Sequence, residues 1–241
     1  MKISVCIATY NGEKYIIEQL ISIMNQLSDS DEIIISDDGS NDRTLELIES
    51  IGDKRIHLFN NEGAKSPIKN FENSLIHASG DFIFLCDQDD VWMPNKVSSC
   101  LKVLKDCDLV LHDAYIVDVK LQIISDSLFE VRKSHKGFIN NLYKNSYVGC
   151  CMAFRRDIML KTLPFPSNIA MHDMWIGLNA ELYGKIEFIA DKLILYRRHE
   201  NNASITIGVS DKNIYQKINY RLYFLVCILR KLNFYHVFRK K

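Results

Sequence analysis

Short apolar runs alternate with segments of helical periodicity along the first half of the chain. Runs such as Ile33-Ile34-Ile35 are apolar at every position, which is typical of strands buried on both faces between layers of helices. The pattern therefore predicts an α/β fold with a Rossmann-like, mostly parallel central sheet and helices on both faces. Strands are expected at residues 3–8, 32–36, 56–59 and 82–86, and helices at residues 13–27, 43–51, 68–78 and 95–104.

The second half of the chain is less regular. We expect strands at residues 109–117 and 148–154, a helix at 174–183 that ends at Gly184, and a pair of strands at 186–189 and 193–196 joined through Ala-Asp-Lys. No linker-like stretch or internal repeat divides the chain. We therefore expect one domain over residues 1–205, with halves at 1–105 and 106–205, followed by a helical tail at 206–241.

Polar side chains follow three of the expected strands. They are Thr9-Tyr10-Asn11-Gly12, Asp37-Asp38-Gly39-Ser40 and Asp87-Gln88-Asp89-Asp90. The carboxyl ends of parallel strands lie at one edge of a sheet, and ligands of such folds bind outside that edge. The sequence therefore predicts that these three loops meet at one crevice.

Three carboxylates crowd into four positions in the last of these loops. Asp87, Asp89 and Asp90 raise one another's pKa, so they cannot all ionise without a compensating cation. Oxygen ligands suit Mg²⁺ or Mn²⁺, either of which shares its remaining positions with water and phosphate. The alternative is a solvated acidic loop that caps the helix after Pro94.

Asp37 and Asp38 end another buried strand. A carboxylate at this place can accept a hydrogen bond from a ribose hydroxyl or a pyrimidine N–H, and the alternative is a helix cap. A metal-bound phosphate beside a base-reading carboxylate indicates a nucleotide. The usual phosphate loops are not in the sequence, which has neither GxxxxGKS/T nor GxGxxG.

Three motifs together carry a resemblance to a known family. Thr9-Tyr-Asn-Gly, Ser36-Asp-Asp-Gly-Ser and Phe84-Leu-Cys-Asp-Gln-Asp-Asp-Val-Trp-Met-Pro, in this order and spacing, resemble the family 2 glycosyltransferases with the GT-A fold. The likeness covers residues 1–205. Together with His172-Asp-Met-Trp and Tyr196-Arg-Arg-His, the third motif is most similar to the bacterial branch of surface-polysaccharide rhamnosyl- and hexosyltransferases.

The resemblance implies roles for individual residues. Asp89 and His199 would bind Mn²⁺ or Mg²⁺, and Asp173 would be the catalytic base. Asp173 stands where the family usually has Glu-Asp, although the pair here is His172-Asp173, and a helix cap is its alternative role. The residues that would bind the nucleotide sugar are Thr9, Tyr10, Asn11, Asp38, Asp87 and Asp90. Arg197 and Arg198 close an expected strand and can pair with phosphate oxygens of the same ligand, and the alternative for them and for His199 is a surface basic cluster.

The implied reaction is inverting transfer of a hexose or deoxyhexose. The donor would be a UDP- or dTDP-linked sugar, and the acceptor a lipid-linked glycan of bacterial O-antigen or capsule synthesis. Such a reaction needs a base for the acceptor hydroxyl and positive charge for the leaving diphosphate. Clustered aspartates also serve nucleotidyltransferases and phosphohydrolases, and a non-catalytic sugar-nucleotide-binding protein is a third reading.

Charge is distributed unevenly along the chain. The sequence has 30 basic and 30 acidic side chains, but from Lys212 onwards it has eight Lys or Arg and no Asp or Glu. The acidic remainder argues against nucleic acid as a partner. Apolar residues of the tail fall on one helical face, namely Leu222, Leu225, Val226, Leu229 and Leu232, so the tail either lies on an anionic membrane surface or packs on the body.

Seven cysteines without repeated CxxC spacing indicate reduced, structural thiols. The first residues read as a strand and not as a signal peptide, so we expect cytoplasmic residence, with peripheral contact at the inner membrane if the tail binds there. His112, Asp113, Trp92 and Trp175 are expected to be structural, and the alternatives are that His112 and Asp113 line the acceptor side and that either Trp stacks on a sugar.

Overall fold

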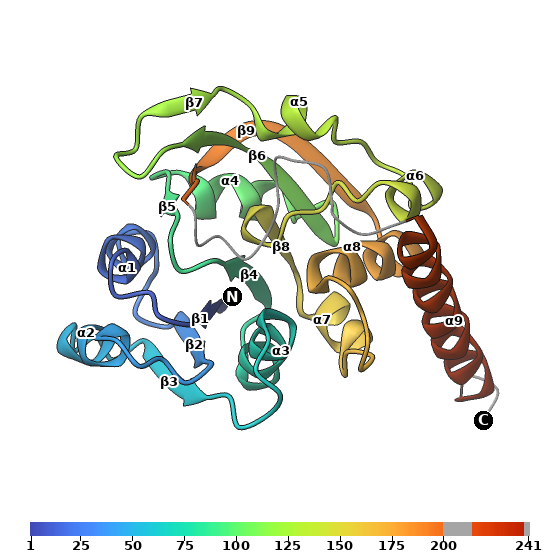
Figure 1. Ribbon diagram of the computed structural model, residues 1–241, viewed down its shortest axis with the longest axis horizontal. Coiled ribbons are helices and arrows are strands. Elements are labelled where there is room, and N and C mark those ends of the chain that lie inside the picture. Colours follow the sequence, from blue (N-terminus) through green and yellow to red (C-terminus); the bar gives the residue numbers. More distant parts are fainter. Residues whose placement is uncertain (200–213, 239–241) are drawn as a thin grey trace.

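The structure is a computed structural model that describes residues 1–199 and 214–238. Its sheet has the strand order β3-β2-β1-β4-β8-β6-β9-β5, and β7 pairs with β6 (Figure 1). The strands are β1 (Ile3–Thr9), β2 (Glu32–Asp37), β3 (Ile56–Asn60), β4 (Phe82–Cys86), β5 (Val91–Trp92), β6 (Leu109–Val117), β7 (Ile123–Ser125), β8 (Met152–Arg155) and β9 (Ile186–Arg197). The helices are α1 (Ile16–Met24), α2 (Thr44–Ser50), α3 (Pro67–His77), α4 (Lys96–Val103), α5 (Leu128–Arg132), α6 (Phe138–Tyr143), a 3₁₀ turn η1 (Gly149–Cys151), α7 (Arg156–Thr162), α8 (His172–Tyr183) and α9 (Ile214–Phe238).

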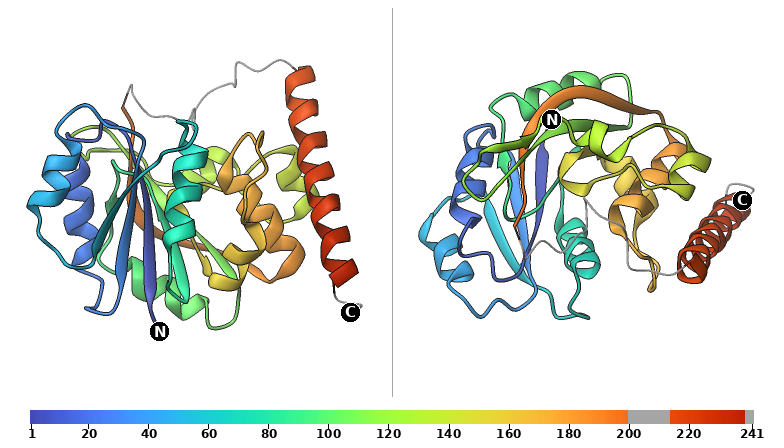
Figure 2. Two further views of the ribbon diagram at one scale, coloured as in Figure 1. Left: turned by 90° about the horizontal axis from the view of Figure 1, so that it is seen from below. Right: turned by 45° about the horizontal axis from the view of Figure 1, so that its top comes forward.

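The first half forms the parallel part of the sheet, as predicted. β1 pairs in parallel with β2 and β4, and β2 pairs in parallel with β3. Every residue of β2 and β4 is buried, because α1 and α2 cover one face of these strands and α3 the other (Figure 2). α3 begins where Ser66 accepts a hydrogen bond from the Lys69 amide and Pro67 occupies the first turn.

The strand order reverses between β1 and β4. The chain moves outward from β1 to β2 and β3, and then crosses back through α3 to reach β4 on the other side of β1. Connections that leave in opposite directions separate the loops at the carboxyl ends of β1 and β4. A crevice is therefore built into the topology at this edge, between the loops that follow Thr9 and Cys86.

Two predictions for the second half are wrong. The expected strand at 148–154 begins as η1, so only Met152–Arg155 forms a strand, antiparallel to β4 and β6. The expected pair at 186–189 and 193–196 is one strand, β9, which runs parallel to β6. The Ala-Asp-Lys segment is absorbed as an irregularity, because the register with β6 shifts beside His112 and Asp113.

The tail helix α9 packs against α8. Phe224 and Ile228 on its inner face are 1% and 3% exposed, and the Phe224 ring centroid lies 6.0 Å from that of Trp175. Within the described part of the chain, no helix has the combination of length and apolar character that a bilayer span requires. Trp175 is thus a core residue, as expected, and it links α9 to the helix that carries Asp173.

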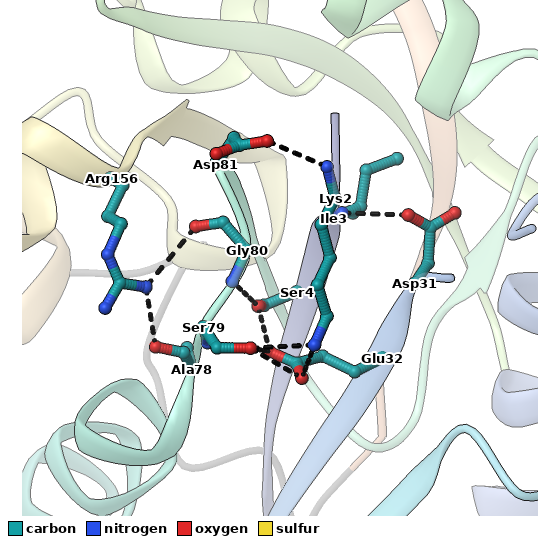
Figure 3. Close-up of polar contacts among 10 residues, drawn as sticks. All are labelled: Lys2, Ile3, Ser4, Asp31, Glu32, Ala78, Ser79, Gly80, Asp81 and Arg156. Atoms are coloured by element: carbon teal, nitrogen blue, oxygen red, sulfur yellow. Dashed lines mark hydrogen bonds and ion pairs between the residues drawn. The ribbon is translucent and has the colours of Figure 1, made fainter. Parts of the chain in front are cut away.

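A polar network closes the opposite edge of the sheet, at the amino ends of the first strands (Figure 3). Glu32 is buried there and accepts hydrogen bonds from the Ser4 and Ser79 hydroxyls, while Lys2 Nζ lies 2.5 Å from its second oxygen. Burial alone would raise the pKa of Glu32, but these hydrogen bonds outweigh it and lower the pKa to about 2. This carboxylate therefore ties β1 and β2 to the start of β4.

We predict that Glu32→Gln lowers the free energy of unfolding by about 2–3 kcal/mol at pH 7. Because the folded-state pKa of Glu32 is depressed from 4.5 to about 2, its contribution is complete above the unfolded value and is lost as pH falls. Urea unfolding at pH 7 and pH 3 measures the difference in the free energy of unfolding between the variant and the unmodified protein. This difference should be smaller at pH 3. Glu49→Gln, at an exposed position on α2, is the control, and an equal, pH-independent loss in both variants would contradict the assignment.

Candidate active site

A cavity of about 700 Å³ lies at the carboxyl edge of β1, β2 and β4. The three polar loops predicted from the sequence meet there, together with the first turn of α8. Six of the predicted site residues line it, namely Thr9, Tyr10, Asp38, Asp87, Asp89 and Asp173. The structure therefore brings together residues that are as far as 164 positions apart in the chain.

Asp37 shapes the first two loops and does not line the cavity. Its carboxylate accepts hydrogen bonds from the Gly39 and Ser40 amides, at 2.8 and 2.7 Å, and from the Thr9 hydroxyl at 2.8 Å. The Asn11 carboxamide oxygen accepts from the Asn41 amide at 2.9 Å. Thr9 and Asn11, both expected to bind the nucleotide, therefore use their side chains to join the two loops.

Gln88 joins the first and third loops. Its carboxamide oxygen accepts from the Tyr10 amide at 2.9 Å, and its nitrogen donates to the Tyr10 carbonyl at 3.0 Å. A Cβ atom on Gly12 would lie 2.4 Å from the same Gln88 oxygen, so only glycine permits this close approach. The sequence showed Gln88 and Gly12 within motifs but did not reveal that they touch.

Asp38 faces the cavity from the end of β2. Its side chain is 6% exposed and accepts a hydrogen bond from the Asn61 carboxamide at 2.6 Å. Burial raises the pKa of Asp38, and the Lys65 ammonium partly offsets this effect. Lys65 and Ser66 also line the cavity, so the loop before α3 contributes a cation that the sequence interpretation missed.

The acidic loop after β4 contains three neighbouring carboxyl groups, and their surroundings disfavour the ionised form of two of them. Burial and the neighbouring Asp89 raise the pKa of Asp87 to about 7. Burial and Asp89 also raise the pKa of Asp90 well above its usual range. Asp87 lines the cavity, whereas Asp90 is 1% exposed and lies behind it. A cation on the cavity side would favour the ionised form of these groups.

A buried lysine lies behind this loop. Lys96 is fully buried, donates to the Cys150 carbonyl at 2.7 Å and lies 4.2 Å from the Trp92 ring centroid. Its charge lowers the pKa of Asp87 and so partly opposes the effect of burial. Trp92 is therefore a structural residue, as expected, and Lys96 is an internal cation that the sequence interpretation missed.

Arg197 forms hydrogen bonds to the backbone and side chain of the acidic loop. Its side chain is 3% exposed, its Nε donates to the Asp89 carbonyl at 2.7 Å, and its amide donates to Asp90 Oδ1 at 3.0 Å. Its remaining nitrogens reach Val119 O and the Glu18 carboxylate. The guanidinium is buried behind the loop and does not line the cavity, so contact between Arg197 and the nucleotide sugar stays a prediction.

His199 and Asp89 are in contact. His199 Nε2 lies 2.7 Å from Asp89 Oδ2, and the His199 ring stacks on Tyr15 at 5.1 Å between centroids. The neighbouring Arg198 is half-buried, does not line the cavity, and is held through its amide, which donates to Val117 O at 2.8 Å. The metal-binding role of His199 and the nucleotide-binding role of Arg198 both stay predictions.

The donors around Asp89 fit a hard divalent cation. A carboxylate oxygen and an imidazole nitrogen are both ligands that Mn²⁺ accepts. A second group, formed by Asp87, Asp90 and Cys150, has its donor atoms within 4.8 Å of one another. There the hydrogen bond with Cys151, together with burial, raises the pKa of the Cys150 thiol, so it stays protonated and is a poor ligand for such an ion.

Asp173 faces the cavity from the first turn of α8. It is 6% exposed, and its Oδ1 accepts hydrogen bonds from the Met174 amide and, at 3.5 Å, from the Asn145 carboxamide. Burial raises the pKa of Asp173 to about 6, although the Arg132 charge and these hydrogen bonds oppose it. The group is thus ionised at neutral pH but retains a basicity suited to accepting a proton.

His172 also lines the cavity, beside Asp173. Its ring stacks on Phe71 with 4.2 Å between centroids, and a Cβ on Gly149 would lie 2.9 Å from its Nε2. Burial lowers the pKa of His172 to about 4, so the imidazole is neutral at pH 7. A neutral ring beside the candidate base adds no charge to that part of the cavity.

Known proteins resemble this chain in sequence and in fold. Residues 4–163 match the family model described as Glycosyl transferase family 2. The chain is 29% identical over 230 residues to the dTDP-rhamnosyl transferase RfbG of Shigella flexneri, covering 88% of this chain and 77% of RfbG. It is 28% identical over 165 residues to the UDP-Glc:alpha-D-GlcNAc-diphosphoundecaprenol beta-1,3-glucosyltransferase WfgD of Escherichia coli, covering 68% of this chain and 64% of WfgD.

A solved structure extends the likeness to the fold. TarS residues 1–349 of S. aureus, in complex with UDP-GlcNAc, superpose with a TM-score of 0.74 at 22% identity, covering 94% of this chain and 67% of that one. The predicted GT-A fold is thereby confirmed. The chain spans less than two thirds of WfgD and 66% of another curated relative.

We predict that Gly12→Ala lowers the free energy of unfolding by about 1–3 kcal/mol, because the new Cβ collides with the Gln88 carboxamide. In a Gln88→Ala background the collision partner is gone, so the same substitution should cost less by about 1 kcal/mol or more. Urea unfolding of the four proteins of this cycle measures the coupling. Additive effects of the two substitutions would refute the contact.

Proposed function

Because the chain belongs to glycosyl transferase family 2, we propose that it transfers a hexose or deoxyhexose from a UDP- or dTDP-linked sugar to a lipid-linked glycan. The observation that carries the proposal is the convergence of Asp38, Asp89 and Asp173 on one cavity. The names of two relatives support the substrate classes, since WfgD is described as acting on a diphosphoundecaprenol-linked sugar and RfbG as a dTDP-rhamnosyl transferase. The product would belong to a bacterial surface polysaccharide, either O-antigen or capsule.

The donor side of the cavity suits a nucleoside. Asp38 offers a buried carboxylate to a base N–H or a ribose hydroxyl, and Asn61 holds that carboxylate in place. Tyr10 is 52% exposed at the cavity edge, so its ring is available to stack on a base. Lys65 brings positive charge to the same side, where a ligand that carries phosphate groups would gain from it.

The diphosphate would lie beside the acidic loop. Asp89 and His199 would hold Mn²⁺ or Mg²⁺, and Asp87 would face the ribose or the diphosphate. When bound, the cation supplies positive charge to the departing diphosphate. Arg197 fixes the backbone at Asp89 and Asp90, so that the loop keeps its shape while the charges repel one another.

Asp173 would act as the base of an inverting displacement. The acceptor hydroxyl oxygen forms a bond to the anomeric carbon as the bond from that carbon to the diphosphate oxygen breaks. The hydroxyl proton passes to the Asp173 carboxylate, and the electron pair of the broken bond leaves with the nucleoside diphosphate. Asn145 and the Met174 amide hold the carboxylate in position for this transfer.

Two rival functions can be distinguished from glycosyl transfer by what they release. A nucleotidyltransferase or phosphohydrolase would release nucleoside monophosphate or exchange pyrophosphate, and a binding protein would turn over nothing. Incubation with sugar-labelled UDP and dTDP sugars, Mn²⁺ and a bacterial lipid extract separates these cases. Label in the lipid fraction supports the proposal, whereas monophosphate release without transfer supports the first rival.

We predict that Asp173→Asn lowers the transfer rate by about a hundredfold or more. In the unmodified protein kcat/KM should fall as pH drops below about 6, because protonation of Asp173 removes the base. Initial rates from pH 5 to pH 8 measure this fall in kcat/KM. Asp157→Asn, an exposed aspartate in the first turn of α7, is the control, and full activity of Asp173→Asn would exclude the base assignment.

We predict that Asp89→Ala also lowers the transfer rate by about a hundredfold, and that His199→Ala raises the half-saturating Mn²⁺ concentration by about tenfold. Both effects follow from loss of a cation ligand beside the diphosphate. Initial rates against Mn²⁺ concentration, after treatment with EDTA, measure them. The exposed Asp106→Ala is the control, and Mn²⁺ curves that coincide for the His199 variant and the unmodified protein would rule out the ligand role.

A further inference from the structure

The helix α9 carries a row of exposed apolar side chains along its outer side. Their spacing of three and four positions places them on one narrow helical face, which we call the outer stripe. Side chains of the stripe are between 43% and 77% exposed. The stripe consists of Tyr215, Ile218, Leu222, Val226 and Leu229.

The opposite face of α9 is already used. Phe224 and Ile228 are buried there, and Lys231 places its ammonium 5.4 Å from the Trp175 ring centroid. A helix that is apolar on opposite sides is usually buried on both of them. Within residues 1–199, the body contacts the inner side of α9 and leaves the outer stripe exposed, so the stripe has the composition of a second buried face.

The neighbouring helix α6 also has exposed apolar side chains. Ile139 and Tyr143 of that helix are 72% and 77% exposed. Arg221 joins the two helices, because its Nε donates to the Leu142 carbonyl at 2.9 Å and its guanidinium carbon lies 5.5 Å from the Tyr143 ring centroid. α6 and α9 lie side by side at one end of the molecule (Figures 1 and 2). Several exposed apolar side chains on two neighbouring helices mark an interaction surface, whereas single exposed apolar residues do not.

Charge identifies the partner of this surface. From Lys212 onwards the sequence has eight basic and no acidic residues, and Arg230 is exposed beside the outer stripe. A second copy paired about a two-fold axis would bring one basic helix against another, which is electrostatically unfavourable. A bilayer with anionic headgroups instead offers negative charge for Arg230 and an apolar interior for the stripe.

We propose that the outer stripe, with Ile139 and Tyr143, docks on an anionic lipid bilayer, with α9 lying in the plane of the headgroups. The inference depends on α6 and α9 alone, and it stands whether or not the proposed reaction is correct. Its consequence for that reaction is positional. Phe224 of α9 packs on Trp175, which lies two residues after Asp173 in α8. The docked helix α9 would therefore contact the helix that carries the candidate base.

Sedimentation of the full chain with vesicles tests the proposal. We expect binding to vesicles of phosphatidylcholine with phosphatidylglycerol, and binding about tenfold weaker to phosphatidylcholine alone or at 0.5 M salt. Leu222→Glu/Leu229→Glu should lower binding to the anionic vesicles by about tenfold or more. The matched control is Ile123→Glu/Ile124→Glu on β7, where side chains of similar exposure lie far from α9 (Figure 1).

Circular dichroism and thermal melting of each variant check that the substitutions at exposed positions leave the fold intact. Equal vesicle binding by the stripe variant and the unmodified protein would overturn the proposal. So would the absence of vesicle binding in the unmodified protein. A dimer seen by light scattering, lost in the stripe variant and insensitive to vesicles, would overturn it in favour of an interface between two copies.

Discussion

Repulsion among the carboxylates at the end of β4 is the constraint on which the candidate site depends. Asp87, Asp89 and Asp90 follow a fully buried strand, and the pKa values of Asp87 and Asp90 are raised because burial and Asp89 disfavour their charge. The loop keeps its conformation because Arg197, at the end of β9, holds the Asp89 carbonyl and the Asp90 carboxylate. The carboxylates are therefore held in fixed positions, with Asp89 and Asp87 toward the cavity.

The topology decides what this charge can meet. The strand order reverses between β1 and β4, so the loops after these strands part and leave space for a ligand. Asp37 and Gln88 link the three loops through hydrogen bonds to Thr9 and Tyr10. α8 then brings Asp173 to the same space from the second half of the chain. The donor side and the candidate base thus face each other across one cavity.

The sequence was informative where the signal is local. Apolar runs such as Ile33-Ile34-Ile35 predicted buried strands, and the loops that follow them contain Asp38, Asp87 and Asp89 as predicted. Hydrophobic periodicity says which side of an element is buried, but it does not say which distant group lies there. The burial of Arg197 against the acidic loop joins residues 107 positions apart, and no local pattern encodes such a contact. Lys96 was missed for the same reason, since a lysine in an amphipathic helix ordinarily faces solvent.

The most direct measurement of the central claim is anomalous diffraction near the manganese edge from crystals grown with UDP and Mn²⁺. The account predicts a single strong anomalous peak in contact with the Asp89 carboxylate and the His199 imidazole, with the uracil ring beside Asp38. Bound UDP without manganese at Asp89, or UDP bound outside the cavity between β1 and β4, would contradict it.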